Sequence, residues 1–232
     1  NSLITGLSPG SYTLTVTDTL GCIDIDSVVI IEPDSMVATI TNVIGASCNG
    51  LCDGSATVAG SGGNPPYGYS WNTTPIKTSA VATGLCARTY TVILLDMQGC
   101  MATVDTIVPE PDTLVATVAI IQNVSCNGAN DGQAAVTATG GTPVYSYIWS
   151  IVPFQTTATA TSLEPGNHTV NVIDTNGCTA SASAIITQPA VFTVSVGPIT
   201  HVNCSGDNDG EAIAIAAGGT PPYTYLWDDI QV

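Results

Sequence analysis

The chain has 232 residues and a formal net charge of −16, because only two basic side chains, Lys77 and Arg88, stand against 18 carboxylates. This charge excludes binding to a nucleic-acid backbone or to anionic lipid headgroups, since both need a surface rich in Lys and Arg. Hydrophobic residues make up 44% of the chain, which excludes a charged disordered tail, and no apolar run approaches the roughly 18 residues of a membrane span.

The sequence repeats itself with a period of 78 residues. In this register Asn1 is equivalent to Ser79 and Val232 to Phe154, so both ends fall in one loop that varies between copies. We therefore expect the chain to be part of a longer array, in a filament or a giant protein. One tryptophan and two cysteines of each copy carry the period: Trp71, Trp149 and Trp227; Cys22, Cys100 and Cys178; Cys48, Cys126 and Cys204.

The first expected strand covers residues 12–17, where Tyr12, Leu14 and Val16 alternate with threonines. Later copies contain short runs rich in Val, Ile and Thr, separated by Gly-Gly-x-Pro, Asp-Gly and Asn-Gly turns. Strands at this spacing predict an all-β fold of tandem immunoglobulin-like β-sandwich domains. In the second copy the strands are expected at 36–43, 55–59, 67–71, 78–83, 89–95 and 102–108.

Proline-containing linkers separate the copies at Glu32-Pro33, Glu110-Pro111 and Gln188-Pro189. Proline fixes φ and cannot donate to a strand ladder, so each linker should be short and stiff. The expected domains are the C-terminal half of a repeat at 1–33, complete repeats at 34–111 and 112–189, and the N-terminal half of a repeat at 190–232.

Aromatic residues at fixed positions of the repeat are expected to be structural. One tryptophan per copy indicates a core residue. Tyr12 and Tyr90 follow a turn and begin a strand, as in a tyrosine corner. His168 takes that position in the third copy, so we expect it to be structural and not catalytic.

Three ordered patterns recur through the chain, with substitutions between copies: Cys-Asn-Gly-x-x-Asp-Gly, Gly-Gly-Thr-Pro-Pro-Tyr-x-Tyr-x-Trp and Leu-x-Pro-Gly-x-Tyr-Thr-Val. They resemble the SprB repeat, a family named for a giant gliding-motility adhesin of Bacteroidetes, and the resemblance covers essentially the whole chain. It implies a long, secreted, cell-surface repeat protein exported by the type IX system. The middle copy departs from the pattern, since it adds Cys52 and Cys86 and lacks the Pro-Gly.

The eight cysteines favour an oxidising, extracellular setting and are expected to form disulfides, because a zinc site would need two close Cys or His pairs. Cys52 and Cys86 occur only in the middle copy, so they should bond each other. For the others we favour bonds within a domain, although a seven-strand sandwich would place those cysteines at opposite ends. That scheme gives Cys48–Cys100 and Cys126–Cys178 and leaves Cys22 and Cys204 for neighbours. The alternative, across the linkers, gives Cys22–Cys48, Cys100–Cys126 and Cys178–Cys204.

Calcium is the one candidate cofactor. Carboxylates in the Asp-Gly loops offer the hard oxygens that calcium prefers. The sequence favours plain turns over calcium sites, because the rest of an EF-hand loop, including its distal Glu, is lacking. The candidate ligands are Asp53, Asp131, Asp207 and Asp209.

Five Asp-Ser/Thr-apolar triplets resemble the O-glycosylation signal used by Bacteroidetes, although a chain rich in Ser and Thr also produces such triplets by coincidence. Ser35 and Thr113 lie in linkers, where a sugar would not disturb a core. The candidate residues are Thr19, Ser27, Ser35, Thr106 and Thr113.

The carboxylates are scattered over turns and linkers, and no Ser/His/Asp constellation recurs, so we expect no catalysis. The sequence predicts a structural repeat region of an extracellular filament, stalk or giant cell-surface adhesin, with a mechanical and adhesive role. Expected partners are neighbouring copies of the repeat, with surface glycans or a substratum as candidates. Two alternatives stay open: ligand-binding adhesin domains that depend on glycans or calcium, and a pilin-like subunit whose half-domains are completed by neighbours.

Overall fold

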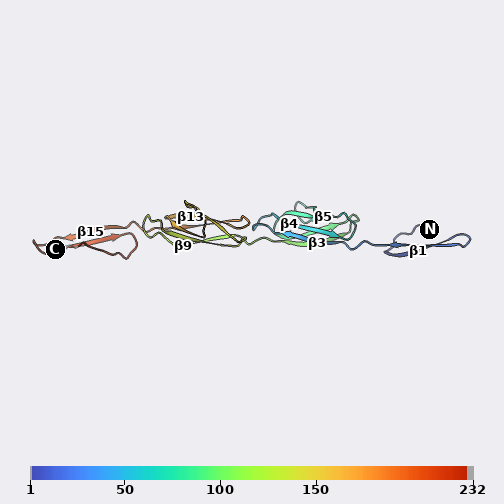
Figure 1. Ribbon diagram of the computed structural model, residues 1–232, viewed down its shortest axis with the longest axis horizontal. Helices are drawn as coiled ribbons and strands as arrows, with labels where there is room; N and C mark the ends of the chain where they lie inside the picture. Colours follow the sequence, from blue (N-terminus) through green and yellow to red (C-terminus); the bar gives the residue numbers. More distant parts are fainter. Residues whose placement is uncertain (1, 229–232) are drawn as a thin grey trace. The chain divides into compact units, whose positions relative to one another are not determined.

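The structure of the chain, a computed structural model, describes residues 2–228, and its regular secondary structure there consists of β-strands (Figure 1). No helix in this part of the chain is long and apolar enough to cross a membrane. The chain divides into two compact units, one of residues 1–46 and 50–110 and the other of residues 47–49 and 111–232. The short segment 47–49 thus belongs to the second unit, although the strands on either side of it belong to the first.

The complete repeat of the first unit contains all six strands predicted from the sequence, with ends that differ by at most three residues. They are β3 (Val37–Ile44), β4 (Gly54–Ser61), β5 (Gly68–Trp71), β6 (Val81–Leu85), β7 (Arg88–Leu95) and β8 (Met101–Val108). They form two antiparallel sheets, with the orders β3-β4-β6 and β5-β7-β8. In immunoglobulin terms these are sheets A-B-E and C-F-G, the constant-type arrangement without strand D.

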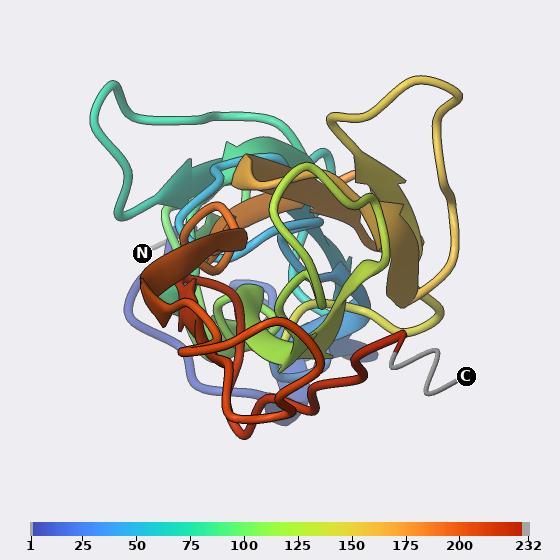
Figure 2. The same ribbon diagram turned by 90° about the vertical axis from the view of Figure 1, so that its left-hand side faces the viewer.

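The complete repeat of the second unit has the same topology. Its strands are β9 (Val115–Gln122), β10 (Gly132–Thr139), β11 (Ser146–Trp149), β12 (Thr159–Leu163), β13 (Gly166–Ile173) and β14 (Thr179–Ile186). The sheets have the orders β9-β10-β12 and β11-β13-β14. In both repeats the loop after the third strand projects from the strands, in teal after β5 and in yellow after β11 (Figure 2).

Each sandwich closes over a tryptophan at the end of its third strand. Trp71 and Trp149 are fully buried. The indole Nε1 of Trp149 donates to the carbonyl of Thr157 at 3.0 Å, and Trp71 makes the equivalent bond to Ser79 at 2.9 Å. Because the polar edge of the ring is satisfied, its whole apolar area can be buried at no hydrogen-bonding cost. The burial of Trp71 and Trp149 confirms the core position predicted for these two tryptophans.

The tyrosine corner is present as predicted. The Tyr90 hydroxyl donates to the carbonyl of Cys86, four residues earlier, at 3.1 Å. His168 replaces the tyrosine in the next repeat, and its Nε2 lies 2.9 Å from the carbonyl of Glu164. Tyr12 makes the same bond in the first part of the chain. The imidazole is therefore a structural substitute for a phenol.

The two ends of the chain are half-repeats, each a two-stranded antiparallel sheet. β1 (Gly10–Thr17) and β2 (Ile23–Ile30) correspond to β7 and β8 of the complete repeat. β15 (Thr193–Thr200) and β16 (Glu211–Ala217) correspond to β9 and β10. Each half-repeat therefore contains strands of one sheet of the sandwich.

The inner faces of the half-repeats are exposed. Leu14 and Val16 on β1 are 62% and 56% exposed, whereas their counterparts Val92 and Leu94 are fully buried. Trp227 is 51% exposed. In a complete repeat the second sheet covers the equivalent positions. The half-repeats therefore have the apolar residues of a sandwich core without the second sheet that would bury them.

Candidate functional site

The expected calcium ligands close loops within the protein. Asp131 Oδ1 accepts the backbone N–H of Ser125 at 2.9 Å, and Asp209 Oδ1 accepts that of Asn203 at 3.1 Å. Hydrogen bonds from the Ser125 hydroxyl and N–H hold the pKa of the Asp131 carboxyl below its usual value. Asp53 and Asp207 are exposed in the corresponding loops.

No group of three or more His, Cys, Asp or Glu side chains is placed to hold a metal ion within the part of the chain that the structure describes. Calcium binding stays a prediction. A melting temperature that a chelator leaves unchanged would contradict it.

The linker serines and threonines are accessible, and one strand candidate is not. Ser35 and Thr113 are exposed, and the Thr113 hydroxyl donates to Asn49 Oδ1 at 2.8 Å. Thr19 and Ser27 are exposed as well. Thr106 is only 9% exposed within β8, so the folded repeat has no room for a sugar there. This burial argues against a sugar at Thr106. The Asp-Ser/Thr-apolar triplet alone does not indicate whether a strand residue faces the core or the solvent.

The structure joins Cys52 to Cys86, with the two Cα atoms 3.9 Å apart. The residue two positions after Cys52 is Gly54, which begins β4 and pairs with Leu85 at the end of β6. Both cysteines therefore lie just beyond the same end of one sheet. This is the pair expected from its restriction to the middle copy.

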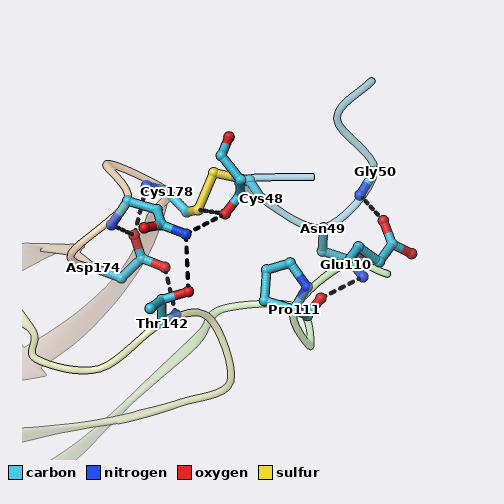
Figure 3. The surroundings of a disulfide bond; sticks show 10 residues. Cys48, Asn49, Gly50, Glu110, Pro111, Thr142, Asp174 and Cys178 are labelled. Carbon is cyan, nitrogen blue, oxygen red and sulfur yellow. Dashed lines mark hydrogen bonds between the residues drawn. A yellow bond between two sulfur atoms is a disulfide. The ribbon is translucent and has the colours of Figure 1, made fainter. Parts of the chain in front are cut away.

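A second disulfide joins Cys48 to Cys178, 130 positions further along the chain (Figure 3). Its Cα atoms are 5.7 Å apart. The bond overturns both schemes derived from the sequence, since it is neither within a domain nor between the cysteines flanking one linker. The other repeat-wide cysteines are unbonded and exposed in the structure: Cys22, Cys100, Cys126 and Cys204.

The bond within a domain fails because its two cysteines lie at opposite ends of the sandwich. Cys48 follows β3, where the N–H of Ala46 donates to the carbonyl of Pro109 just beyond the end of β8 (2.8 Å). Cys100 precedes the start of β8, which is eight residues long. That strand alone spans roughly 26 Å at 3.3 Å per residue, whereas a disulfide needs Cα atoms about 6 Å apart.

The loop that carries Cys48 is anchored to the proline linker. Asn49 Nδ2 donates to the carbonyl of Pro111 at 3.1 Å. The N–H of Gly50 donates to Glu110 Oε2 at 2.6 Å (Figure 3). The Cys-Asn-Gly phrase and the Glu-Pro phrase, 60 residues apart in the sequence, are therefore parts of one local structure.

The hairpin that carries Cys178 is built around Asp174, which is only 5% exposed. Asp174 Oδ1 accepts the N–H groups of Asn176 and Cys178 at 2.9 and 2.8 Å, and Oδ2 accepts that of Thr142 at 2.7 Å. From this hairpin Asn176 Nδ2 donates to the carbonyl of Ser47, next to Cys48, at 2.8 Å. The hydrogen bonds therefore hold the two cysteines against each other.

Competing effects set the pKa of the Asp174 carboxyl. Burial acts to raise it, but hydrogen bonds from the backbone N–H groups of Thr142 and Cys178 outweigh burial and hold the pKa below 3.8. In the preceding repeat the N–H of Asn64 is the largest influence, and it holds the pKa of Asp96 below 3.8 as well. Both carboxylates are thus ionised at neutral pH.

Sequence reasoning missed the roles of Asp174 and Asn176. A signal for the first was present, because an Asp stands four residues before the cysteine of every hairpin, at Asp18, Asp96 and Asp174. Asn176 has no such signal, since its counterparts are Leu20 and Gln98.

Comparison with known proteins identifies the repeat. The SprB repeat family matches residues 37–74, 118–152 and 196–232, one match in each of three copies. No curated protein sequence matches the chain significantly.

Two solved structures are similar in part. The N-terminal eight Ig domains of Down Syndrome Cell Adhesion Molecule isoform 1.30.30 match over 83% of this chain, with 14% identity and a TM-score of 0.31. The chain spans 32% of that protein's length. A tetra-tandem repeat in the extending region of a large adhesion protein matches over 91% of this chain and 71% of its own, with 15% identity and a TM-score of 0.26. Three tandem matches to the family model identify these segments of the chain as SprB repeats.

Proposed function

We propose that the chain is a structural, non-catalytic repeat region of an extracellular filament or giant cell-surface adhesin. The observation that carries this proposal is the Cys48–Cys178 disulfide, which connects a loop of repeat 34–111 to a hairpin of repeat 112–189. Disulfides form and persist in oxidising compartments outside the cell. A second covalent connection between repeats suits a protein that bears tension.

The mechanical role follows from where the load would pass. When the chain is pulled from its ends, the disulfide carries the force, and the residues between Cys48 and Cys178 stay slack. Only the remaining residues can unravel and lengthen the chain. The disulfide thus limits extension after a domain has unfolded.

Pulling single chains by their ends tests this role. Cys178→Ser releases 130 positions, of which Cys52–Cys86 still closes 34, so the fully unfolded chain should lengthen by roughly 330 Å at about 3.4 Å per residue. Cys100→Ser is the matched control and should leave the final length unchanged, because Cys100 is unbonded. Equal lengths for Cys178→Ser and the unaltered chain would contradict the proposal.

The extracellular location has its own test. Antibodies raised against the chain should label intact, unpermeabilised cells, and electron microscopy of sheared surface material should show labelled fibres. Labelling that appears only after lysis would overturn the location.

A second candidate function is a pilin-like subunit whose half-repeats complete each other between chains. The exposed inner face of β1 and the exposed Trp227 favour it, because a complete repeat buries the corresponding residues in one core. Light scattering should then show oligomers that grow with protein concentration, and burial of Trp227, now 51% exposed, should shift its fluorescence to the blue. Leu14→Asp should prevent both changes. A chain that stays monomeric at every concentration would exclude this candidate.

We also expect O-linked sugar on Ser35 or Thr113, the exposed linker residues of two Asp-Ser/Thr-apolar triplets. Thr106 should remain bare, because it is buried. Mass spectrometry of the native protein, intact and after digestion, locates any sugar. An intact mass without added hexose would contradict the expectation.

A further inference from the structure

We infer that every repeat-wide cysteine left unbonded in this chain pairs with a cysteine of an adjacent repeat, so that each repeat is bonded to both of its neighbours. Two kinds of cysteine take part. The loop cysteines are Cys48, Cys126 and Cys204, and the hairpin cysteines are Cys22, Cys100 and Cys178.

The observed bond supplies the rule for pairing. Cys48 bonds the hairpin cysteine that stands 130 positions later. Within the 232 residues it is the one loop cysteine for which such a position exists. By the same rule Cys126 and Cys204 take hairpin cysteines of following repeats, and Cys22 and Cys100 take loop cysteines of preceding repeats. The four unbonded cysteines are thus the four that this rule leaves over.

The loop of Cys126 is prepared for the bond in the same way as that of Cys48. Asn127 Nδ2 donates to the carbonyl of Pro189 at 3.0 Å, and the N–H of Gly128 donates to Gln188 Oε1 at 2.9 Å. These bonds repeat those that anchor the Cys48 loop to its linker, at 3.1 and 2.6 Å. Cys126 is therefore held in the position from which Cys48 bonds.

The hairpins of the unbonded cysteines are prepared as well. Asp96 Oδ1 accepts the N–H groups of Gln98 and Cys100, each at 2.9 Å. Asp18 Oδ1 accepts the N–H of Cys22 at 2.8 Å. The same bond from Cys178 to Asp174 is present where the disulfide has formed. The conformation of the hairpin tip therefore does not depend on the disulfide.

A hollow of about 450 Å³ lies beside Cys126. Its lining includes Ser125 and Thr220. At the bonded site their counterparts, Ser47 and Thr142, are the two residues that Asn176 Nδ2 contacts, at 2.8 and 3.1 Å. The surfaces that hold the Cys178 hairpin are thus repeated around Cys126. The occupant is the hairpin of a following repeat, with its cysteine facing Cys126.

Formation of each bond is a two-electron oxidation. Two thiols lose two protons and two electrons, and an external disulfide such as glutathione disulfide takes them up and is reduced to two thiols. Exposure of the four cysteines allows the exchange to start from either partner.

Counting thiols in the denatured, unreduced chain separates the pairing schemes. Eight cysteines with the two observed bonds leave four thiols. Pairing within domains would leave two, and pairing across linkers would leave none. Four thiols, located by alkylation and peptide mapping at Cys22, Cys100, Cys126 and Cys204, are the expected result, and two or none would overturn the inference.

Lengthening the chain by one period tests Cys126 directly. Residues 155–232 are repeated after Val232, which places the added copy of Cys178 130 positions after Cys126. After refolding in a glutathione buffer the lengthened chain should contain a bond from Cys126 to that cysteine and again four thiols. Six thiols in the lengthened chain, with Cys126 still alkylated, would overturn the inference.

The matched control carries Cys178→Ser in the added copy alone. It should have five thiols, because Cys126 loses its partner while Cys48–Cys178 remains. Peptide mapping of monomeric protein from a non-reducing gel reads both chains in the same way. A control with the same thiol positions as the lengthened chain would show that Cys126 pairs elsewhere and would also overturn the inference.

Discussion

The carboxylate of Asp174 joins the segments of the repeat that surround the disulfide. Its two oxygens accept N–H groups from two segments of the repeat, the Gly-Gly-x-Pro turn and the hairpin tip. An ionised carboxylate accepts such bonds better than a protonated one, so the local structure depends on its charge.

This charge predicts a dependence of stability on pH. The folded-state pKa of Asp174 is lower than 3.8, so its contribution is complete above that value and is lost as the pH falls below it toward the folded-state pKa. We expect urea unfolding midpoints of the chain to fall between about pH 4 and pH 2. Asp174→Asn should lower the midpoint at pH 7 and reduce the acid dependence. Asp112→Asn, at an exposed linker position, is the control, and equal behaviour of the two variants would contradict the prediction.

The tryptophans offer a comparison at one position of the repeat. Trp149→Ala removes a fully buried side chain and should destabilise its sandwich by about 3–5 kcal/mol. Trp227→Ala, at a residue that is 51% exposed, should cost less than about 1 kcal/mol. Urea unfolding followed by far-ultraviolet circular dichroism measures both. A similar cost for the two would mean that Trp227 is covered in solution, as in the pilin-like alternative.

At the scale of elements, the Gly-Gly turn explains why two glycines recur in each copy. Gly140 has φ of +72°, and a Cβ there would lie 2.0 Å from the carbonyl oxygen of Thr113. A Cβ on Gly141 would lie 2.6 Å from Asp174 Oδ2. The turn therefore passes so close to the linker and to the carboxylate that neither position admits a side chain.

Gly140→Ala should destabilise the repeat strongly, because both the positive φ and the contact with Thr113 oppose it. Gly177 has a similar φ of +85° but open space around it, so Gly177→Ala isolates the backbone term of about 1–2 kcal/mol. Thermal melts of the two variants should differ, with Gly140→Ala the lower. Equal melting temperatures would show that the turn moves to accept the methyl group.

The strands and the Cys52–Cys86 disulfide could be predicted from the sequence, and the Cys48–Cys178 disulfide could not. Alternation of apolar residues and the turn phrases located all six strands, because both signals are local in the chain. The partner of Cys48 depends on which loop of one repeat meets which hairpin of the next. The sequence period does not reveal this partner, since a shift by one whole repeat leaves the spacing of the cysteines unchanged. The same limit hid the role of Asn176, whose contact with Ser47 lies 129 residues away.

At the scale of the whole molecule, the disulfides predict an unusual response to trypsin. Lys77 and Arg88 are the two cleavage sites, and both lie between Cys48 and Cys178. After denaturation with thiols blocked, cleavage at both sites should leave one species on a non-reducing gel. Reduction should release residues 1–77, 78–88 and 89–232.

Two variants distinguish the pairings in this digest. Cys178→Ser should release residues 89–232 without reduction, whereas Cys100→Ser should not. The opposite pattern would indicate a Cys48–Cys100 bond. Residues 78–88 should stay attached to residues 1–77 in both variants, because Cys52–Cys86 is intact.

The length of the Cys48–Cys178 ring has a consequence for durability. The ring closes 130 positions, whereas the repeat is 78 residues long, so it already contains Cys126, where the next ring would begin. In an array bonded throughout by the inferred rule, the rings would overlap, and every peptide bond of the bonded repeats would lie inside at least one of them. A single hydrolysed bond would then leave the array in one piece. An array of this kind would tolerate isolated cuts along its length and fail only after damage had accumulated at neighbouring places.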